Sequence, residues 1–130
     1  MRCLDTDLLV SILRGEDEAR KIVVELDEEA KGATTSINAF EIFFGAYKSE
    51  RKDENVKETT KLLKRLMVFS LDLSSAQRVA QISATLAASG ETIDFRDAMI
   101  AAIALDNNLT LITRNKAHFK RVKNLKIEEW

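Results

Sequence analysis

Acidic side chains recur where a predicted strand has just ended or a predicted helix has just begun. The set, completed by one amide, comprises Asp5, Asp7, Glu41, Asp94, Asp97 and Asn115. These side chains offer only oxygen ligands, which suit a hard divalent cation such as Mg²⁺ or Mn²⁺. Carboxylates that hold such an ion can support hydrolysis of phosphodiester bonds. The first hypothesis is therefore a metal-dependent nuclease.

Most of these acids also have a structural explanation. Asp5 or Asp7 would cap a helix that starts near residue 6. Asp94 would cap a later helix, and Asp97 in its first turn would interact favourably with the helix dipole. A functional role is favoured for Asp97, because the apolar run AMIAAIAL after it carries the carboxylate toward the interior. Burial there costs several kcal/mol unless a cation compensates. Pairing with Arg96 is the other way to compensate it.

Glu41 borders a row of apolar side chains that we expect to form the buried face of a helix. The row is Ile37, Phe40, Phe44 and Tyr47. Gly45, one turn after Glu41, leaves space beside the carboxylate at a cost of roughly 1 kcal/mol in helix propensity. A partly buried acid with free space beside it suggests a ligand or a metal. The alternative is a glutamate at a helix border that reaches water.

A basic run near the end of the sequence complements the acids. Between Arg114 and Lys126 there are six Lys or Arg residues and no acid. Such a run could hold a phosphate backbone, and its first members, Arg114, Lys116 and Lys120, are candidate RNA contacts. An ordinary solvated face is the alternative. His118 in this run is the chain's only histidine. One histidine is not a zinc site, and we expect a surface or packing role.

Short strands alternate with helices in the elements that must position these residues. We expect helices at 6–14, 16–31, 36–47, 56–67, 74–89 and 95–106, a charged loop at 48–55, and extended segments at 1–5, 33–36, 68–72, 109–113 and 125–130. Ser36 is the expected N-cap of one helix, and Ser74 with Gln77 has capping-box spacing for another. The alternation predicts an α/β fold in three layers, with a mainly parallel sheet covered on both faces. Ligands then bind where the strand order reverses.

Length and composition support one domain over residues 1–130. The chain has 45% hydrophobic and 32% charged residues and a formal net charge of −1. Its single cysteine, Cys3, excludes a disulfide framework and fits a reducing, cytoplasmic setting. No apolar run is long enough for a membrane span. Zero Pro and four Gly argue against an all-β fold with many tight turns.

Four segments together resemble the PIN-domain family, specifically the VapC-type toxins of toxin–antitoxin pairs. In order along the chain they are LDTDLLVSIL, FEIFFGA, DFRDAMIAAIAL and LTLITRNKAHFKRVKNLKIEEW. The resemblance implies a small three-layer α/β/α domain with Mg²⁺- or Mn²⁺-dependent endoribonuclease activity. It also implies a homodimer that a VapB-type antitoxin holds inactive.

The resemblance also implies roles for the acids. Asp5, Glu41 and Asp97 match the three acids of the family's metal site, and Asp94 matches a less regular, accessory position. Asn115 matches a fourth position that is Asp in many members and Asn in others. Because an amide is a weaker ligand than a carboxylate, this argues against a second tightly held metal. Asp7 stands where the family often has Asn, which favours a role in ordering the loop.

In the mechanism that this family implies, the ion activates a water and polarises the scissile phosphate, so that no side-chain nucleophile is needed. The alternative is a non-catalytic PIN-like module that binds RNA or a protein. The Asp5–Asp7 pair also resembles that of haloacid-dehalogenase-type phosphatases, but the glycine turn of that family is missing after residue 9.

Overall fold

A five-stranded sheet forms the centre of the computed structural model, which describes residues 1–29 and 32–130. Its strands are β1 (Arg2–Leu4), β2 (Gly32–Thr35), β3 (Met67–Phe69), β4 (Thr110–Ile112) and β5 (Lys126–Glu128). Their order is β3-β2-β1-β4-β5, and the four pairings are all parallel. The order reverses between β1 and β4, so the carboxyl ends of these two strands flank the crevice where such sheets bind ligands.

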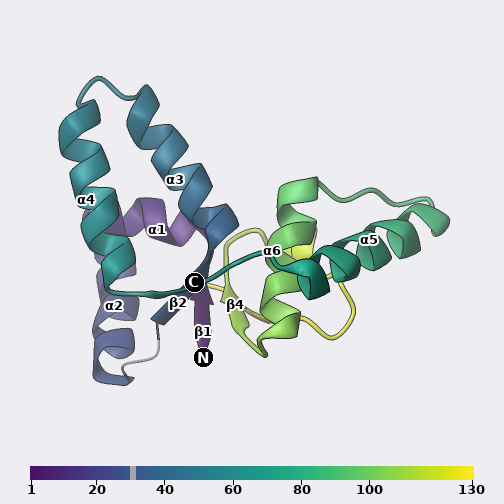
Figure 1. The fold of residues 1–130 in the computed structure, drawn as a ribbon. Helices are drawn as coiled ribbons and strands as arrows, with labels where there is room; N and C mark the ends of the chain where they lie inside the picture. The colour runs from purple at the N-terminus through teal and green to yellow at the C-terminus, as the bar shows by residue number, and fades with distance from the viewer. Residues whose placement is uncertain (30–31) are drawn as a thin grey trace.

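Helices cover both faces of the sheet and confirm the predicted three-layer α/β class (Figure 1). On one side lie α1 (Thr6–Leu13), α2 (Asp17–Glu29), α3 (Ser36–Lys48) and α4 (Lys52–Lys64). On the other side lie α5 (Leu73–Ala88), α6 (Phe95–Asp106) and the short α7 (Lys116–Phe119). No helix within residues 1–29 and 32–130 has the length and apolar character needed to cross a membrane.

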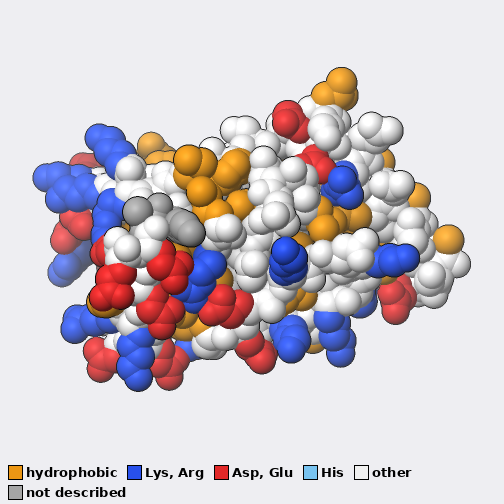
Figure 2. Space-filling view, turned by 90° about the horizontal axis from the view of Figure 1, so that it is seen from below, with side chains coloured by type: hydrophobic (Ala, Val, Ile, Leu, Met, Phe, Trp, Pro, Cys, Tyr) orange, Lys and Arg blue, Asp and Glu red, His pale blue; other side chains and the backbone are white. Residues whose placement is uncertain are grey.

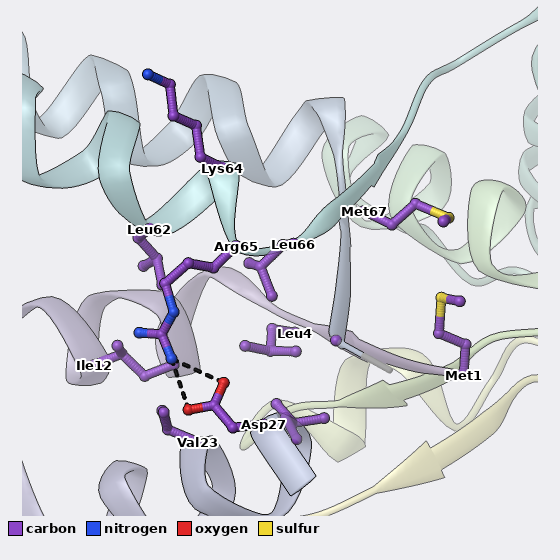
Figure 3. Close-up of a pocket in the computed structure, with 12 residues that line it drawn as sticks. Met1, Leu4, Ile12, Val23, Asp27, Leu62, Lys64, Arg65, Leu66 and Met67 are labelled. Atoms are coloured by element: carbon purple, nitrogen blue, oxygen red, sulfur yellow. Dashed lines mark hydrogen bonds and ion pairs between the residues drawn. The ribbon is translucent and has the colours of Figure 1, made fainter. Parts of the chain in front are cut away.

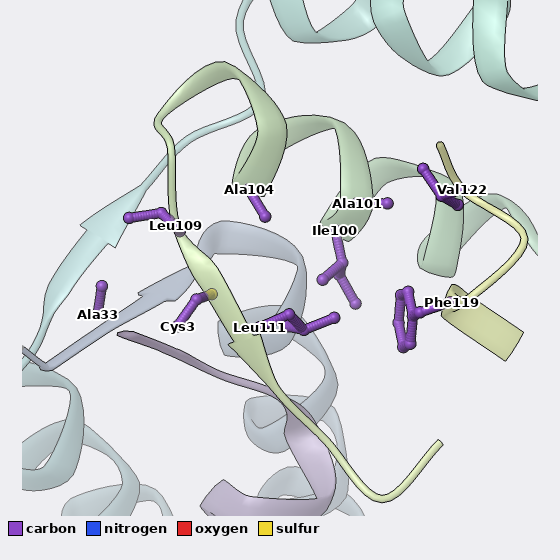
Figure 4. Close-up of a cluster of buried hydrophobic side chains, with 9 residues drawn as sticks. All are labelled: Cys3, Ala33, Ile100, Ala101, Ala104, Leu109, Leu111, Phe119 and Val122. Carbon is purple, nitrogen blue, oxygen red and sulfur yellow. The ribbon is translucent and has the colours of Figure 1, made fainter. Parts of the chain in front are cut away.

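The two core clusters follow from the alternation of side chains along the strands. Cys3 and Leu111 point to the α6 side, where they pack with Phe119 of α7 (Figure 4). Their neighbours Leu4 and Ile112 point to the other side and pack against α1, α2, α3 and α4. The apolar helix predicted at 95–106 is α6, and six of its residues are buried. The sheet is therefore fixed on both faces, which holds the ends of β1 and β4 in place.

The orientation of α3 differs from the prediction. The expected buried row is largely exposed, with Phe40, Phe44 and Tyr47 accessible to 56%, 53% and 60%. The helix buries Ile42 and Ala46 instead, against α1 and α4. The inward face of α3 therefore carries Asn38, Ile42 and Ala46, and the aromatic side chains lie on the opposite, exposed face.

Several helix ends also differ. The predicted loop 48–55 is largely helical, because α4 begins at Lys52 with Asp53 and Glu54 in its first turn, where the helix dipole favours acids. The helix predicted over 16–31 is α2, which ends at Glu29 among the described residues, and positions 30 and 31 lie outside them.

Two predicted caps are replaced by a neighbouring residue. Thr35, not Ser36, caps α3 through a hydrogen bond from the backbone N–H of Asn38. Asp72 caps α5 in a reciprocal capping box with Ser75, in place of the pair expected at 74 and 77. In both cases the capping side chain accepts from the amide three positions later, which satisfies one otherwise unpaired helix donor.

Candidate functional site

Asp5 lies at the end of β1, at the point where the strand order reverses. Its side chain is the N-cap of α1 and is only 4% exposed. Oδ1 accepts hydrogen bonds from the backbone N–H of Thr6 at 2.9 Å and from Nδ2 of Asn38 at 3.0 Å. Oδ2 accepts from the hydroxyl of Thr113, just after β4, at 2.6 Å. Capping and a functional role are thus compatible, because each carboxylate oxygen has more than one lone pair.

Glu41 is linked to Asp5 through two polar side chains, the half-buried Thr6 and the buried Asn38. The hydroxyl of Thr6 donates to Oε1 of Glu41 at 3.2 Å and accepts from Nδ2 of Asn38 at 3.0 Å. The carbonyl oxygen of the Asn38 side chain accepts in turn from the hydroxyl of Thr35 at 2.7 Å. The fully buried Asn38 amide therefore uses both its N–H groups and its oxygen, and it fixes two acids from different elements relative to each other.

Asp97 lies in the first turn of α6 at the mouth of the site. Its side chain is 25% exposed, so the apolar helix leaves it half-buried and does not carry it into the interior. Arg96, proposed as its partner, instead bonds Asp94, whose Oδ1 caps α6. His118 of α7 approaches Asp97 with 3.5 Å between Nδ1 and Oδ2. This approach was not predicted from the sequence, which gives no spacing signal between the two residues.

Asp7 lies close enough to Asp5 for its charge to raise the pKa of that carboxyl, but its shortest hydrogen bonds come from other segments. Its Oδ2 accepts from the backbone N–H of Arg114 at 2.9 Å, and its Oδ1 accepts from the indole N–H of Trp130 at 3.1 Å. Asp7 thus ties the start of α1 to the segment after β4 and to the residue after β5. This arrangement agrees with the predicted role in ordering a loop.

The residues predicted to contact RNA differ in whether their side chains already have partners within the chain. Lys116 and Lys120 are exposed. The guanidinium of Arg114 lies over the ring of Trp130, 3.6 Å from its centroid, and also pairs with Glu18. Asn115 is exposed beside them, and its side chain makes no capping hydrogen bond to α7. The amide of Asn115 is therefore available to a ligand.

Burial and mutual repulsion raise the pKa values of the acids that come together here. Burial raises the pKa of Asp5 to about 6, although the hydrogen bonds from Thr113, Thr6 and Asn38 oppose this rise. Burial also raises the pKa of Glu41, and the charges of Asp97 and Asp94 add to it. The pKa of Asp97 is raised by burial and by Asp94. Shifts of this kind, in a polar crevice, are typical of functional sites.

A divalent ion would relieve these unfavourable charges. Within the described residues, no three His, Cys, Asp or Glu side chains gather into a ready-made metal cluster. The donor set nevertheless fits Mg²⁺ or Mn²⁺, because it is all oxygen and carries excess negative charge between Glu41 and Asp97. Mg²⁺ keeps several of its waters, so protein carboxylates need not surround it completely.

A large cavity lies elsewhere in the structure. It measures about 590 Å³, is lined by Leu4, Leu62 and Leu66, and has the Arg65–Asp27 ion pair beside it, but it contains none of the predicted site residues (Figure 3).

Acidic and basic side chains are intermixed over the half of the surface that holds α1 to α4, seen from below (Figure 2). That view shows no continuous basic track for a nucleic acid.

A groove of about 420 Å³ opens beside Glu41, between α1, α3 and α4. Val10, Leu13, Ile42, Gly45 and Ala46 supply an apolar lining, and Glu54 and Glu58 supply acids. A Cβ atom added at Gly45 would meet nothing within 4 Å, so the glycine keeps this space open as predicted.

Three residues of the site were missed in the sequence. Thr6, Asn38 and Thr113 carry the hydrogen bonds that orient Asp5 and Glu41. A buried polar residue between apolar neighbours, such as Asn38 within SINAF, is the signal that could have identified one of them. The threonines carry no such signal, because Thr is common in strands and at helix ends.

Comparison with known proteins places the chain among relatives of one kind. A family model described as PIN domain matches residues 2–125. The chain is 28% identical to a tRNA(fMet)-specific endonuclease VapC from Shigella flexneri and 30% identical to ribonuclease VapC2 from Haemophilus influenzae, in both cases over 98% of this chain and 96% of the relative. The crystal structure of VapBC2 from Rickettsia felis, bound to a DNA fragment from its promoter, is similar with a TM-score of 0.91 and 28% identity, covering 99% of this chain and 98% of that one.

Proposed function

The chain belongs to the PIN-domain family and groups with the VapC ribonucleases, and on that premise we propose that it is a divalent-metal-dependent endoribonuclease, the toxin of a toxin–antitoxin pair. The observation that supports this proposal is that hydrogen bonds through Thr6 and Asn38 connect Asp5 with Glu41, near the reversal of strand order, and that Asp97 lies close enough to Glu41 for its charge to raise the pKa of that carboxyl. Three separate elements supply acids there whose protonated forms are favoured by their surroundings. Such an arrangement costs stability and is explained by a cation that the site binds.

Each residue of the site has a proposed task. Asp5, Glu41 and Asp97 hold the ion, directly or through water, with Asp94 accessory at the mouth and the amide of Asn115 beside them. When bound, the ion supplies Lewis-acid polarisation of the scissile phosphate and a water of lowered pKa. The second layer, Thr6, Asn38 and Thr113, fixes the carboxylates in orientation, as second-layer groups do in metal sites.

The proposed substrate is RNA, held through its backbone. Lys116 begins α7 directly after Asn115, Lys120 is its C-cap, and both lysines are exposed and carry no acid partner among the described ion pairs. We propose that they bind phosphates next to the scissile bond. His118 lies between them in sequence and beside Asp97, and it needs no proton-transfer role in this scheme.

The proposed partner is a VapB-type antitoxin, and the proposed compartment is the cytoplasm. The solved relatives include VapBC complexes from Rickettsia felis and Salmonella typhimurium. We propose that an antitoxin segment lies in the groove beside Glu41. Its apolar floor and the acids Glu54 and Glu58 favour a segment with apolar and basic side chains, and an occupant would cover Glu41.

The Asp97→Asn substitution tests the catalytic proposal. We expect the purified wild-type chain to cleave RNA in Mn²⁺ buffer and to stop when EDTA is added. The variant should lose cleavage by at least about 100-fold while its circular dichroism spectrum and melting temperature are retained. Asp106→Asn, at the far end of α6, is the matched control. Equal cleavage by the Asp97 variant would show that the metal-site assignment is wrong, and cleavage that resists EDTA would point to contamination or to another mechanism. A wild type that does not cleave RNA would leave the non-catalytic RNA- or protein-binding module as the better account.

A further inference from the structure

Trp130 joins two segments that border the candidate metal site. Its indole N–H donates to Oδ1 of Asp7 at 3.1 Å, and its ring packs against the core cluster around Leu4 and Ile112. The guanidinium of Arg114 lies over the same ring, and its Nε donates to the backbone oxygen of Trp130 at 3.4 Å. The side chain of Trp130 thus packs into the core on one side and, on the other, donates a hydrogen bond to Asp7, next to the candidate metal site.

The carboxylate of Asp7 competes with that of Asp5 for one proton. The hydroxyl of Thr113 lies 2.6 Å from Oδ2 of Asp5 and 3.4 Å from Oδ2 of Asp7. A threonine hydroxyl has a single proton to donate. Asp7 leaves that proton to Asp5 because two other donors satisfy it, the indole of Trp130 and the backbone N–H of Arg114.

The same contacts fix the segment that carries Asn115. Arg114 is held by its backbone at Asp7 and by its side chain between the ring of Trp130 and Glu18. The next backbone N–H, that of Asn115, donates to the hydroxyl of Thr113 at 3.0 Å. The hydroxyl of Thr113 therefore contacts both Asp5 and the backbone of Asn115, and its orientation depends on Asp7.

We propose that Trp130 is a positioning residue of the metal site, acting through Asp7 on Thr113 and thereby on Asp5 and Asn115. This inference rests on the proposed metal-dependent function. Loss of the indole donor frees Oδ1 of Asp7, and the carboxylate then turns toward the hydroxyl of Thr113. Asp5 then loses the 2.6 Å hydrogen bond from Thr113 that orients it, and the site binds the divalent ion less tightly.

The Trp130→Phe substitution removes the indole N–H and keeps an aromatic ring for packing and for stacking of Arg114. We expect the Kd for Mn²⁺, measured by titration calorimetry without RNA, to rise about tenfold, as for loss of an outer-layer partner in other metal sites. With RNA, kcat should fall at subsaturating Mn²⁺ and recover at high Mn²⁺, while KM for RNA is unchanged. Asp7→Ala removes the competing carboxylate, so the hydroxyl of Thr113 stays with Asp5. In that background Trp130→Phe should raise the Kd no further, because its effect passes through Asp7.

The matched control is Ile127→Ala on β5. Ile127 packs against the opposite core cluster, around Cys3 and Leu111, so this variant loses melting temperature without touching Asp7. Its Kd for Mn²⁺ should equal that of the wild type. If the Trp130 and Ile127 variants lose affinity in proportion to their loss of melting temperature, the role of Trp130 is only structural and the inference is wrong.

The fluorescence of Trp130, the chain's only tryptophan, gives a second readout in the unaltered protein. Mn²⁺ should change its emission in the wild type and leave it unchanged in Asp97→Asn, which separates site binding from collisional quenching. A wild type that neither binds Mn²⁺ nor cleaves RNA would refute the proposed function itself. A wild type that does both, with Trp130→Phe unchanged in Kd and kcat, would refute only the positioning role.

Discussion

The hydroxyl of Thr113 donates a 2.6 Å hydrogen bond to the carboxylate of Asp5, joining the ends of β4 and β1 across 108 residues of sequence. Both side chains are buried. Burial nevertheless outweighs this hydrogen bond and raises the pKa of Asp5 to about 6. Near neutral pH the folded chain therefore holds the ionised carboxylate of Asp5 in surroundings that favour its neutral form. This lowers the stability of the fold and provides an ionised carboxylate that can bind a cation.

The Asp5→Asn substitution should stabilise the metal-free protein. The pKa of Asp5 rises from 3.8 in the unfolded chain to about 6 in the folded one, so its contribution to stability is fully present below pH 4 and is lost as the pH rises through 6. An amide removes this loss, its oxygen keeps the two hydrogen bonds that Oδ1 accepts, and its NH2 group donates to the hydroxyl of Thr113 instead of accepting from it. In EDTA at pH 7.5 we expect about 1–3 kcal/mol more free energy of unfolding than for the wild type. Urea titrations at pH 7.5 and pH 4 check this, and a difference that is the same at both pH values contradicts it.

The Asn38→Asp substitution should break the link between Asp5 and Glu41. The amide donates to both Asp5 and Thr6, and a carboxylate in its place would face Asp5 without a proton. We expect at least about 2 kcal/mol lower stability at pH 7.5, less at pH 5, and loss of RNA cleavage. Asn124→Asp, at an exposed position between α7 and β5, is the control and should change stability little. Unaltered cleavage by the Asn38 variant would show that the link is dispensable.

The places of the candidate acids in the fold were predictable from the sequence, because each acid lies next to a strand or helix with a strong local pattern. Asp5 ends an apolar strand, and Asp97 begins a helix that is apolar on almost every side. Positions next to such strong hydrophobic signals are easy to place on a fold, and parallel strands bring their ends together. The order β3-β2-β1-β4-β5 then determines which ends meet.

The orientation of α3 and the supporting hydrogen bonds were not predictable in the same way. Phe40 and Phe44 look like core residues, yet α3 turns Ile42 and Ala46 inward, against α1 and α4. Contacts such as Asp7 with Trp130 join residues 123 positions apart, and no local pattern encodes them. Which distant residues come into contact depends on how the helices and strands pack, and a local sequence pattern does not show this.

The basic residues near α7 should separate into two kinds when RNA binding is measured against salt. Lys116→Ala and Lys120→Ala should each weaken binding and reduce the slope of log K against log salt by about 0.7, the value for one phosphate contact on a single strand. Arg114→Ala should reduce the slope less, because its guanidinium is already held by Glu18 and the ring of Trp130. Filter binding with the cleavage-deficient Asp97→Asn chain gives these slopes. A full loss of 0.7 for Arg114 would show that it leaves Trp130 to bind RNA.

The exposed aromatic row of α3 bears on the homodimer, which stays a prediction. Phe40 and Phe44 stack with 5.9 Å between ring centroids, and both are more than half exposed. Apolar patches of this kind often mark interfaces. We expect a dimer in sedimentation velocity at micromolar concentration and a shift toward monomer in Phe44→Glu. Leu73→Glu, at a side chain 88% exposed on α5, is the control. A Phe44 variant that stays dimeric would exclude this row as the interface.

The Gly45→Leu substitution should test whether an antitoxin segment lies in the groove beside Glu41. A Cβ atom at this position meets nothing within 4 Å, so the new side chain enters the groove, and replacing a mid-helix glycine should add about 0.5–1 kcal/mol of stability. If an antitoxin segment lies in that groove, its affinity should fall at least tenfold, because the apolar floor it needs is occupied. Lys48→Leu adds the same side chain on the same helix outside the groove and should leave the affinity unchanged. Coexpression with the antitoxin, followed by copurification and RNA cleavage assays, measures both properties. A Gly45 variant that is still fully inhibited shows that the antitoxin reaches Glu41 by another route.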